Sequence, residues 1–260
     1  IKKYKNPKLI LYTILLSAIV PFLFATYQLL TGTGLGGTFG AESRLFGTFS
    51  HPNPFASFTL IILIISYLLI IEKQGKFIIW LNYLILTWGF IILIGTFSRG
   101  AWLALLVFVF FVNLLKKPKN LIFVGILFFV LFVSVPAVRD RVEDIYNPPA
   151  DSSVRWRFNQ WQRMFDIFIQ KPLLGTGIGT ETFVHEKEYG FYAGNPYTHN
   201  DFLRVALETG LLGLISYSLL IFSTLIILFK QYKKSQGTIW ENYKLFIFAL
   251  FLAITSFSLT

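Results

Sequence analysis

The stretch FASFTLIILIISYLLII, from Phe55 to Ile71, runs for seventeen residues without an Asp, Glu, Lys or Arg. A helix of roughly 17–25 apolar residues is long enough to cross the hydrocarbon core of a bilayer. The backbone finds no water to bond with inside lipid, so a run of this kind must be helical. The stretch therefore predicts a membrane-spanning helix.

Six further runs without an acidic or basic residue lie on both sides of this stretch. They are Leu9–Leu30, Phe77–Phe97, Ala101–Leu115, Asn120–Val138, Thr209–Phe229 and Leu245–Thr260. Only 14% of the 260 residues are charged and 55% are hydrophobic, whereas a soluble domain carries about 25% charged residues. The sequence therefore predicts an all-α, polytopic transmembrane helical bundle with about seven spans, and excludes a large soluble core.

The spacing of these runs divides the chain into three parts. Residues 1–135 hold the first five spans with short loops, 136–205 form a large outer loop with short helices, and 206–260 hold the sixth span and a truncated seventh. Because the last run reaches Thr260 and the only methionine is Met164, we expect further helices beyond one or both ends. Cysteine is absent, which excludes disulfides and thiolate metal sites.

Lysine and arginine are separated along the chain. If the N-terminal lysines are cytoplasmic, thirteen of the fifteen lysines fall on the inner side, as the positive-inside bias expects. The outer side then holds all eight arginines: Arg44, Arg99, Arg139, Arg141, Arg155, Arg157, Arg163 and Arg204. The net charge of +10 thus reflects membrane topology and gives no reason to expect nucleic acid as a partner.

The outer arginines suggest binding chemistry as well as orientation. Arginine presents a rigid fork that binds phosphate or carboxylate with two hydrogen bonds, whereas lysine is a hydrated point charge. The alternative is that single arginines pair with outer acids such as Asp140, Glu143 and Asp144 or with lipid phosphate.

Two shorter outer segments carry candidate residues. Thr31–Asn53 is rich in glycine (Gly32, Gly34, Gly36, Gly37 and Gly40) and ends on Arg44-Leu-Phe-Gly-Thr-Phe-Ser-His-Pro-Asn-Pro54. Asn53 before Pro54 predicts a helix N-cap, which would place Arg44 and His51 just above the second span. Gly95–Trp102 places Arg99 at the membrane boundary, where an ionisable residue is either functional or reaches toward the headgroups.

The large loop, Pro136–Arg204, is predicted to contain a helix from Asp151 to Gln170. Its aromatic residues Phe158, Trp161, Phe165 and Phe168 share one face. Such a stripe is typical of a helix that lies in the membrane surface, and equally of one that packs on other protein helices.

Two features at the end of this loop invite a chemical interpretation. Gly175-Thr-Gly-Ile-Gly179 is spaced like a nucleotide-binding loop, but no strand precedes it and no GK[ST] follows, so we expect a tight turn. His199 can act as a general base near neutral pH, with Asp201 or Glu208 to orient it. A loop histidine can also be structural, and the three histidines show no metal-ligand spacing.

Four stretches in this order resemble the O-antigen ligase and O-antigen polymerase superfamily. They are Arg44-x-x-Gly-Thr-Phe-x-His-Pro-Asn53, Ser98-Arg99-Gly100, Arg157-x-x-x-Trp161 followed by Pro172-Leu-Leu-Gly-Thr-Gly177, and His199-Asn200 with Glu208-x-Gly210-x-x-Gly213. The chain has fewer spans than the members of this superfamily, in keeping with a segment of a longer protein.

The resemblance implies a membrane glycosyltransferase with a GT-C-like fold in the bacterial cytoplasmic membrane, its site on the outer face. The reaction would be inverting and independent of metal or cofactor, with a glycan on undecaprenyl diphosphate as donor. Carried over by motif, His199, Arg99 and Arg157 would be catalytic, the two arginines gripping the diphosphate. Arg44, Arg155 and Glu208 would bind substrate.

The acceptor stays open between the lipid A core of lipopolysaccharide, a growing polysaccharide and a protein. A second class of protein also stays open, a transporter or flippase for an anionic lipid or solute. Its charges should lie near the bilayer midplane on broken helices, whereas the predicted spans are uncharged.

Overall fold

The structure, a computed structural model, describes residues 7–34, 44–72, 75–134, 139, 140, 142, 143, 146, 147, 149, 153–190 and 197–257. Several residues used in the predictions lie outside this part of the chain: Lys2, Lys3, Lys5, Gly36, Gly37, Gly40, Lys73, Pro136, Arg141, Asp144, Asp151 and Thr260.

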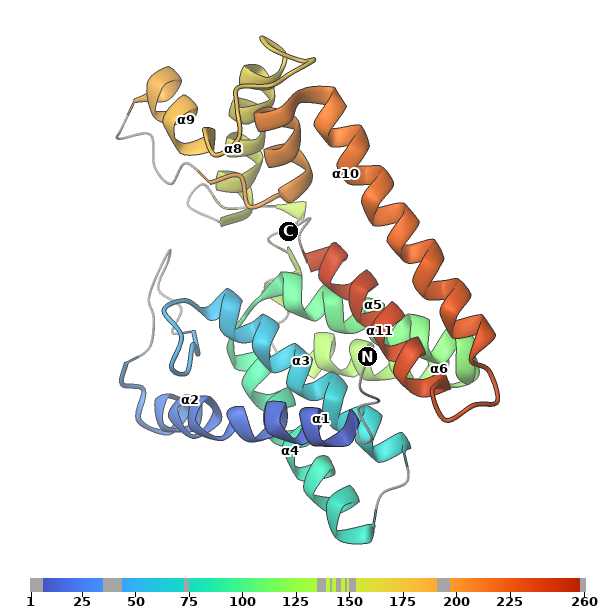
Figure 1. Ribbon diagram of the computed structural model, residues 1–260. Coiled ribbons are helices and arrows are strands. Elements are labelled where there is room, and N and C mark those ends of the chain that lie inside the picture. The colour runs from blue at the N-terminus through green and yellow to red at the C-terminus, as the bar shows by residue number, and fades with distance from the viewer. Residues whose placement is uncertain are drawn as a thin grey trace.

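The described residues fold into helices joined by turns and loops (Figure 1). The helices are α1 (Pro7–Ser17), α2 (Ile19–Thr31), α3 (Pro52–Ile71), α4 (Lys76–Gly95), α5 (Arg99–Lys116), α6 (Asn120–Ser134), α8 (Ser153–Phe168), α9 (Glu181–Tyr189), α10 (Asp201–Lys234) and α11 (Glu241–Phe257). In Figure 1, α1 to α6 and α11 form a bundle, α8 and α9 lie apart from it, and α10 joins the two.

Five helices in the described part are long and apolar enough to cross a membrane: Lys8–Thr31, which combines α1 and α2, then α3, α4, α5 and α10. The predicted all-helical membrane fold is confirmed. The predicted number of spans was about seven; the other two runs correspond to α6 and α11, which have only 15 and 17 residues as described.

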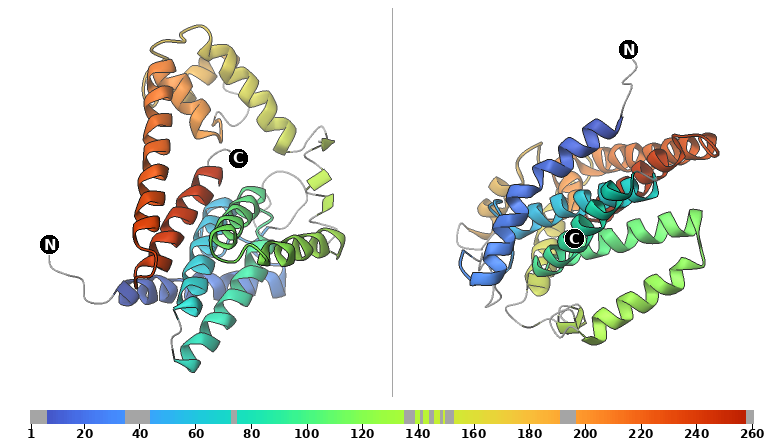
Figure 2. Two further views of the ribbon diagram at one scale, coloured as in Figure 1. Left: turned by 90° about the vertical axis from the view of Figure 1, so that its right-hand side faces the viewer. Right: turned by 90° about the horizontal axis from the view of Figure 1, so that it is seen from below.

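Helix α3 is the centre of the bundle. Its residues Leu60, Ile64 and Leu68 pack in one cluster with Phe108 of α5 and Phe246 of α11. Small side chains in the same cluster, namely Ala104, Ala249 and Ala253, let α5 and α11 approach closely, as is common between helices in lipid. None of the residues in the most apolar window of α10 is buried, as expected of a helix that faces lipid. In Figure 2, α10 runs along one side of the bundle next to α11.

Helix α10 is broken at Gly210, whose backbone is left-handed and extended (φ 67°, ψ −166°). Residues 201–209 form a short segment beside α8, and residues 211–234 form the long segment that descends along the bundle. The break lies next to Thr209, where the sequence predicts the sixth span to begin.

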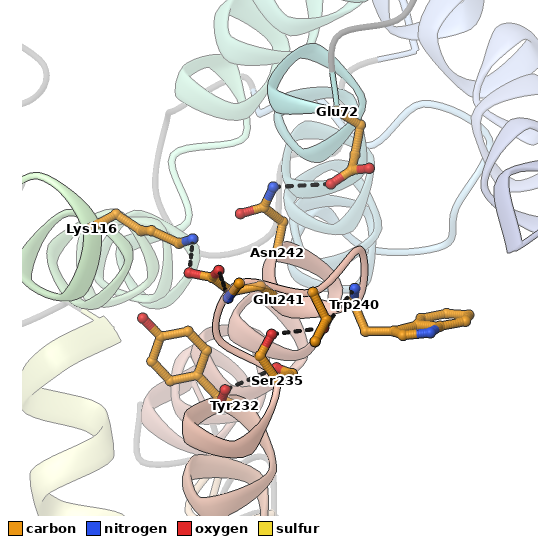
Figure 3. A network of polar contacts seen from close by, with 9 residues as sticks. Glu72, Lys116, Tyr232, Ser235, Trp240, Glu241 and Asn242 are labelled. Carbon is orange, nitrogen blue, oxygen red and sulfur yellow. Dashed lines mark hydrogen bonds and ion pairs between the residues drawn. The ribbon is translucent and has the colours of Figure 1, made fainter.

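The helix ends gather at two opposite ends of the bundle. At one, the C-terminal ends of α3, α5 and α10 meet the start of α11, and Lys116 forms an ion pair with Glu241 while Asn242 donates a hydrogen bond to Glu72 at 3.0 Å (Figure 3). We call this the lysine end; it carries Lys116, Lys117, Lys119, Lys230, Lys233 and Lys234. The opposite end, which carries Arg44, Arg99 and the large loop, is the arginine end.

Candidate active site

The first outer segment is tied to the loop between α4 and α5. Arg44 donates from Nε to the carbonyl oxygen of Thr96 at 2.8 Å and from Nη2 to Oδ1 of Asn53 at 3.0 Å. The backbone N–H of Leu45 donates to the carbonyl of Gly95 at 2.9 Å. Two of the stretches that carry the resemblance, one ending at Asn53 and one centred on Arg99, are therefore neighbours in space.

The start of α3 differs from the prediction. The N-cap is His51, whose Nδ1 accepts a hydrogen bond from the backbone N–H of Asn53 at 3.1 Å, and Pro52 takes the first helical position. The prediction of Asn53 as the cap with Pro54 was wrong by two residues. The side chain of Asn53 accepts from Arg44 instead, so the capping role falls to the histidine.

A buried glutamine that the motifs did not indicate supports this segment. Gln28 of α2 is fully buried, and its Oε1 accepts from the backbone N–H groups of Phe46 and Gly47 at 3.2 and 3.0 Å. Gly47 has a φ of 57°, and a Cβ there would lie 2.9 Å from the Phe55 ring. The segment is thus anchored from α2, α3 and α4 together.

The glycine-rich turn of the large loop docks on the break in α10. Thr176 and Gly177 donate from their backbone N–H groups to the carbonyls of Leu207 and Glu208, both at 2.9 Å, and Leu211 donates to Pro172 at 2.8 Å. A Cβ at Gly210 would lie 2.2 Å from the carbonyl oxygen of Leu173, so only glycine fits. The predicted tight turn is confirmed, and its glycines allow backbone contact with α10.

Helix α8 packs on α10 through a face other than the aromatic stripe. Gln160, Met164 and Ile167 are nearly inaccessible, and Met164 and Ile167 pack with Leu207 of α10. In the predicted stripe, Phe158 and Phe165 remain more than half exposed. With the start of α10 the stripe lines an open cleft of about 670 Å³, whose walls include Phe158, Trp161, Phe165, Phe168, Phe202 and Leu214.

The first outer segment and the large loop come together in a group of two arginines and two histidines, namely Arg44, His51, Arg157 and His199. Burial, followed by the charges of Arg157 and His51, lowers the pKa of His199 below its usual value. Burial, then Arg44 and Arg157, lowers the pKa of His51 in the same way.

Within this group, the guanidinium of Arg157 is a positive charge that is shielded from water. Its guanidinium is removed from solvent far enough for desolvation to lower its pKa. Among the residues that the structure describes, no carboxylate pairs with it.

His199 is held in an uncommon backbone conformation, with a φ of 51°. Its ring lies edge-to-face against Trp156 of α8, with 5.6 Å between the ring centroids. The other non-glycine residue with a positive φ in the described part is Phe97, two residues before Arg99. Left-handed backbone at non-glycine residues clusters at functional sites, and both cases fall at or beside predicted site residues.

The remaining predicted residues take different places. Arg99 is the first residue of α5, close in sequence to the Thr96 carbonyl that binds Arg44. Arg155 is exposed on α8. Glu208 is buried, and its Oε1 accepts from the backbone N–H of Glu181 at 3.4 Å. Whether these three act with His199 and Arg157 stays a prediction.

Two other chemical possibilities, a metal site and a catalytic role for His185, find no support in the described residues. No group of three or more His, Asp or Glu side chains there is placed to hold a metal ion. His185 is fully buried, and neither ring nitrogen has a hydrogen-bond partner among the described residues. Burial and then Arg163 lower its pKa, against the opposing effect of Glu186, so His185 belongs to the packing of α9.

The fold and this site define a polytopic helical membrane protein with a histidine- and arginine-lined site at one end. The O-antigen ligase family model matches residues 84–218, more than half of the chain, and the chain belongs to this family. It is therefore an enzyme of the membrane glycan ligase and polymerase class. Comparison with the curated proteins gives no match. The matched range includes Arg99, Arg157, His199 and Glu208, while Arg44 and His51 precede it and reach it through the contacts above.

Proposed function

We propose that this enzyme transfers a glycan from undecaprenyl diphosphate to a glycan or lipid acceptor at the outer face of the bacterial cytoplasmic membrane. The observation that carries the proposal is Arg157, a desolvated guanidinium without a carboxylate partner among the described residues. A charge removed from water is costly unless it is paired. The diphosphate of a lipid-linked donor supplies that pairing, since a guanidinium binds phosphate oxygens with two parallel hydrogen bonds.

In this proposal the arginines and the histidine have separate roles. Arg157 and Arg99 hold the diphosphate and stabilise the charge that develops on it as it leaves. His199, whose lowered pKa keeps its imidazole neutral near pH 7, takes the proton from the acceptor hydroxyl. The acceptor oxygen then forms a bond with the anomeric carbon on the face opposite the departing diphosphate, so the configuration inverts. No metal ion takes part, because the arginines supply the positive charge.

Three further residues, Arg44, Arg155 and Glu208, were predicted to bind substrate, and in this proposal each has a different role. Arg44 fixes the first outer segment through Thr96 and Asn53. Arg155, exposed two residues from Arg157, is placed to meet the donor or a lipid phosphate. Glu208 accepts a hydrogen bond from the backbone N–H of Glu181 and so helps to fix the start of α9.

The cleft between α8 and α10 suits the lipid part of the donor. It is lined mainly by aromatic and aliphatic side chains, and one of them, Leu214, belongs to the membrane-spanning segment of α10. An isoprenoid chain entering from the bilayer would pass along this apolar wall while its diphosphate reaches Arg157 on the same helix α8. The lysine end supports the outer placement of the site, since lysine-rich ends are retained in the cytoplasm.

The test is a transfer assay with purified protein and the lipid-linked glycan extracted from cells that lack the enzyme. Arg157→Lys keeps the charge but not the two-pronged geometry. Because a charge-assisted contact contributes about 1.5–3 kcal/mol, we expect roughly ten- to a hundredfold slower transfer and weaker donor binding. Arg204→Lys, at an exposed arginine of α10, is the matched control and should leave both unchanged.

Full transfer by Arg157→Lys would refute the role of this guanidinium. The same assay in excess EDTA tests the metal-independent mechanism, since loss of transfer with rescue by a divalent ion would contradict it.

A further inference from the structure

The peptide group of Thr198, directly before His199, is held on both sides by side chains from two different helices. Its N–H donates to Oε1 of Glu181 at 2.6 Å, and its carbonyl oxygen accepts from Nε1 of Trp161 at 2.7 Å. Thr198 is only 2% exposed, so water does not compete for these bonds. On the other side of His199, Oδ1 of Asn200 accepts from the backbone N–H of Leu203 and caps α10.

This arrangement determines where the imidazole points. A residue with a φ of 51° is in a conformation that L-amino acids seldom adopt, so neighbouring contacts must hold it there. The contacts on Thr198 and Asn200 supply that restraint, and Trp156 supports the ring itself.

The carboxylate of Glu181 bonds outside its own helix, α9. Glu181 is the first residue of α9, where an acidic side chain usually faces the helix N-terminus, and the N-cap Thr180 makes no capping bond. The carboxylate of Glu181 instead leaves α9 for a backbone group seventeen positions later. It is nearly buried, with 6% of its surface exposed, and its own N–H donates to Glu208.

We propose that Glu181 is a positioning residue for His199, acting through the Thr198 peptide together with Trp161, and that it connects Glu208 to the reacting centre. The proposal rests on the proposed role of His199 in glycan transfer. Glu181 acts here as a hydrogen-bond acceptor and not as a charge: the groups that shift the pKa of His199 besides burial are Arg157 and His51. A neutral acceptor of the same shape should therefore replace it.

The experiment is a double-mutant cycle on the purified full chain, with transfer measured per correctly inserted molecule. The substrate is the same extracted lipid-linked glycan. Glu181→Ala should lower kcat by roughly a hundredfold, the cost of displacing a catalytic group by about 1 Å, with the KM for the donor nearly unchanged. Glu181→Gln retains the acceptor and should restore kcat. Glu188→Ala, at an exposed glutamate of the same helix, is the matched control and should be neutral.

The cycle separates positioning from simple stabilisation of the loop. If Glu181 acts through His199, then Glu181→Ala should slow the His199→Ala variant no further. An equal loss of kcat in both backgrounds, or a full kcat in Glu181→Ala, would overturn the proposal. If Glu181→Ala fails to insert, Trp161→Phe serves in its place, since it removes the N–H donor to Thr198 and keeps an aromatic ring.

The His199→Ala variant by itself tests the proposed function, separately from the role of Glu181. Full transfer by His199→Ala would remove the catalytic role of this histidine, whatever the behaviour of Glu181. Loss of transfer in His199→Ala with an additive effect of Glu181→Ala would contradict only the positioning role.

Discussion

The two ends of the helical bundle differ in how their charged side chains are neutralised or solvated. At the lysine end the carboxylate of Glu241 meets Lys116 and the backbone N–H of Gly237, and these contacts lower its pKa (Figure 3). Other cations there, such as Lys117 and Lys119, are exposed to solvent. At the arginine end Arg157 is desolvated without a carboxylate among the described residues, and two histidines lie within reach of its charge.

This difference separates a structural network at the lysine end from the proposed binding site at the arginine end. Charges that the protein itself neutralises, or that water solvates, need no ligand. A desolvated cation beside two histidines raises the free energy of the unliganded protein, and an anionic substrate relieves that cost. This difference in charge supports the proposed placement of the donor diphosphate at the arginine end, and it does so without using the motifs.

The prediction with the largest consequence concerns the side of the membrane on which each end lies. The chain has no cysteine, so each introduced thiol is unique. We expect an impermeant maleimide to label Thr48→Cys and Glu188→Cys in intact cells, and to label Pro118→Cys and Gln236→Cys only after permeabilisation. All four positions are exposed in the structure. The reverse pattern would place the arginine end in the cytoplasm and end the proposal of transfer at the outer face.

The next largest effect is expected at His199. Asparagine tolerates a left-handed backbone better than most residues, so His199→Asn should keep the loop conformation while removing the acid–base group. Transfer should fall by about 10²–10⁴, with donor binding nearly intact because the arginines remain. Donor binding lost in parallel with transfer would mean that His199 holds the substrate rather than moving a proton. His185→Ala is no suitable control, since His185 is buried in the packing of α9.

The sequence predicted those parts of this comparison that depend on local patterns. Apolar runs such as Phe55–Ile71 predict spans because lipid allows only helical backbone there, and the separation of lysine from arginine anticipates the two ends. Arg157 and His199 were recognised because their neighbours resemble family motifs. The sequence placed the start of the sixth span at Thr209, but it did not predict the break that the structure has at Gly210.

The parts that sequence could not predict depend on contacts between distant segments. Glu181 belongs to no motif, and its proposed role depends on a contact made where the chain returns at Thr198. Asn53 and His51 both have capping side chains, and the choice between them is made by Arg44, which binds Asn53. The sequence left open whether the aromatic stripe of α8 faces the membrane surface or other helices, and it gave no sign that Met164 and Ile167 pack on α10 while the aromatic residues line the cleft.

A smaller effect should appear in the pH dependence of transfer. In the proposed mechanism the neutral imidazole of His199 is the active base, so its protonation should cause the acidic limb of kcat/KM. Burial, then Arg157 and His51, lowers its pKa, and the limb should lie below pH 6.5, the usual pKa of histidine being about 6.5. Arg157→Gln removes one positive charge, which raises that pKa and moves the limb to higher pH. Arg204→Gln is the control; an identical limb in both variants would show that Arg157 does not act on the base.

The smallest effect is expected at the lysine end, and it tests the other half of the comparison. Glu241→Gln removes the ion pair with Lys116. The side chain of Glu241 is 22% exposed and that of Lys116 is 30% exposed. Solvent screens such a pair, so its loss should reduce stability by only about 0.2–1 kcal/mol, seen as a slightly lower midpoint in thermal unfolding in detergent. Transfer should be unchanged, because the network joins helix ends that lie away from the candidate site. Arg157→Met is the contrasting variant. It removes a desolvated charge that has no carboxylate partner among the described residues, so it should raise the unfolding midpoint of the unliganded protein while it abolishes donor binding. If Arg157→Met were instead destabilised and Glu241→Gln lost transfer, the assignment of structural and binding roles to the two ends would be reversed.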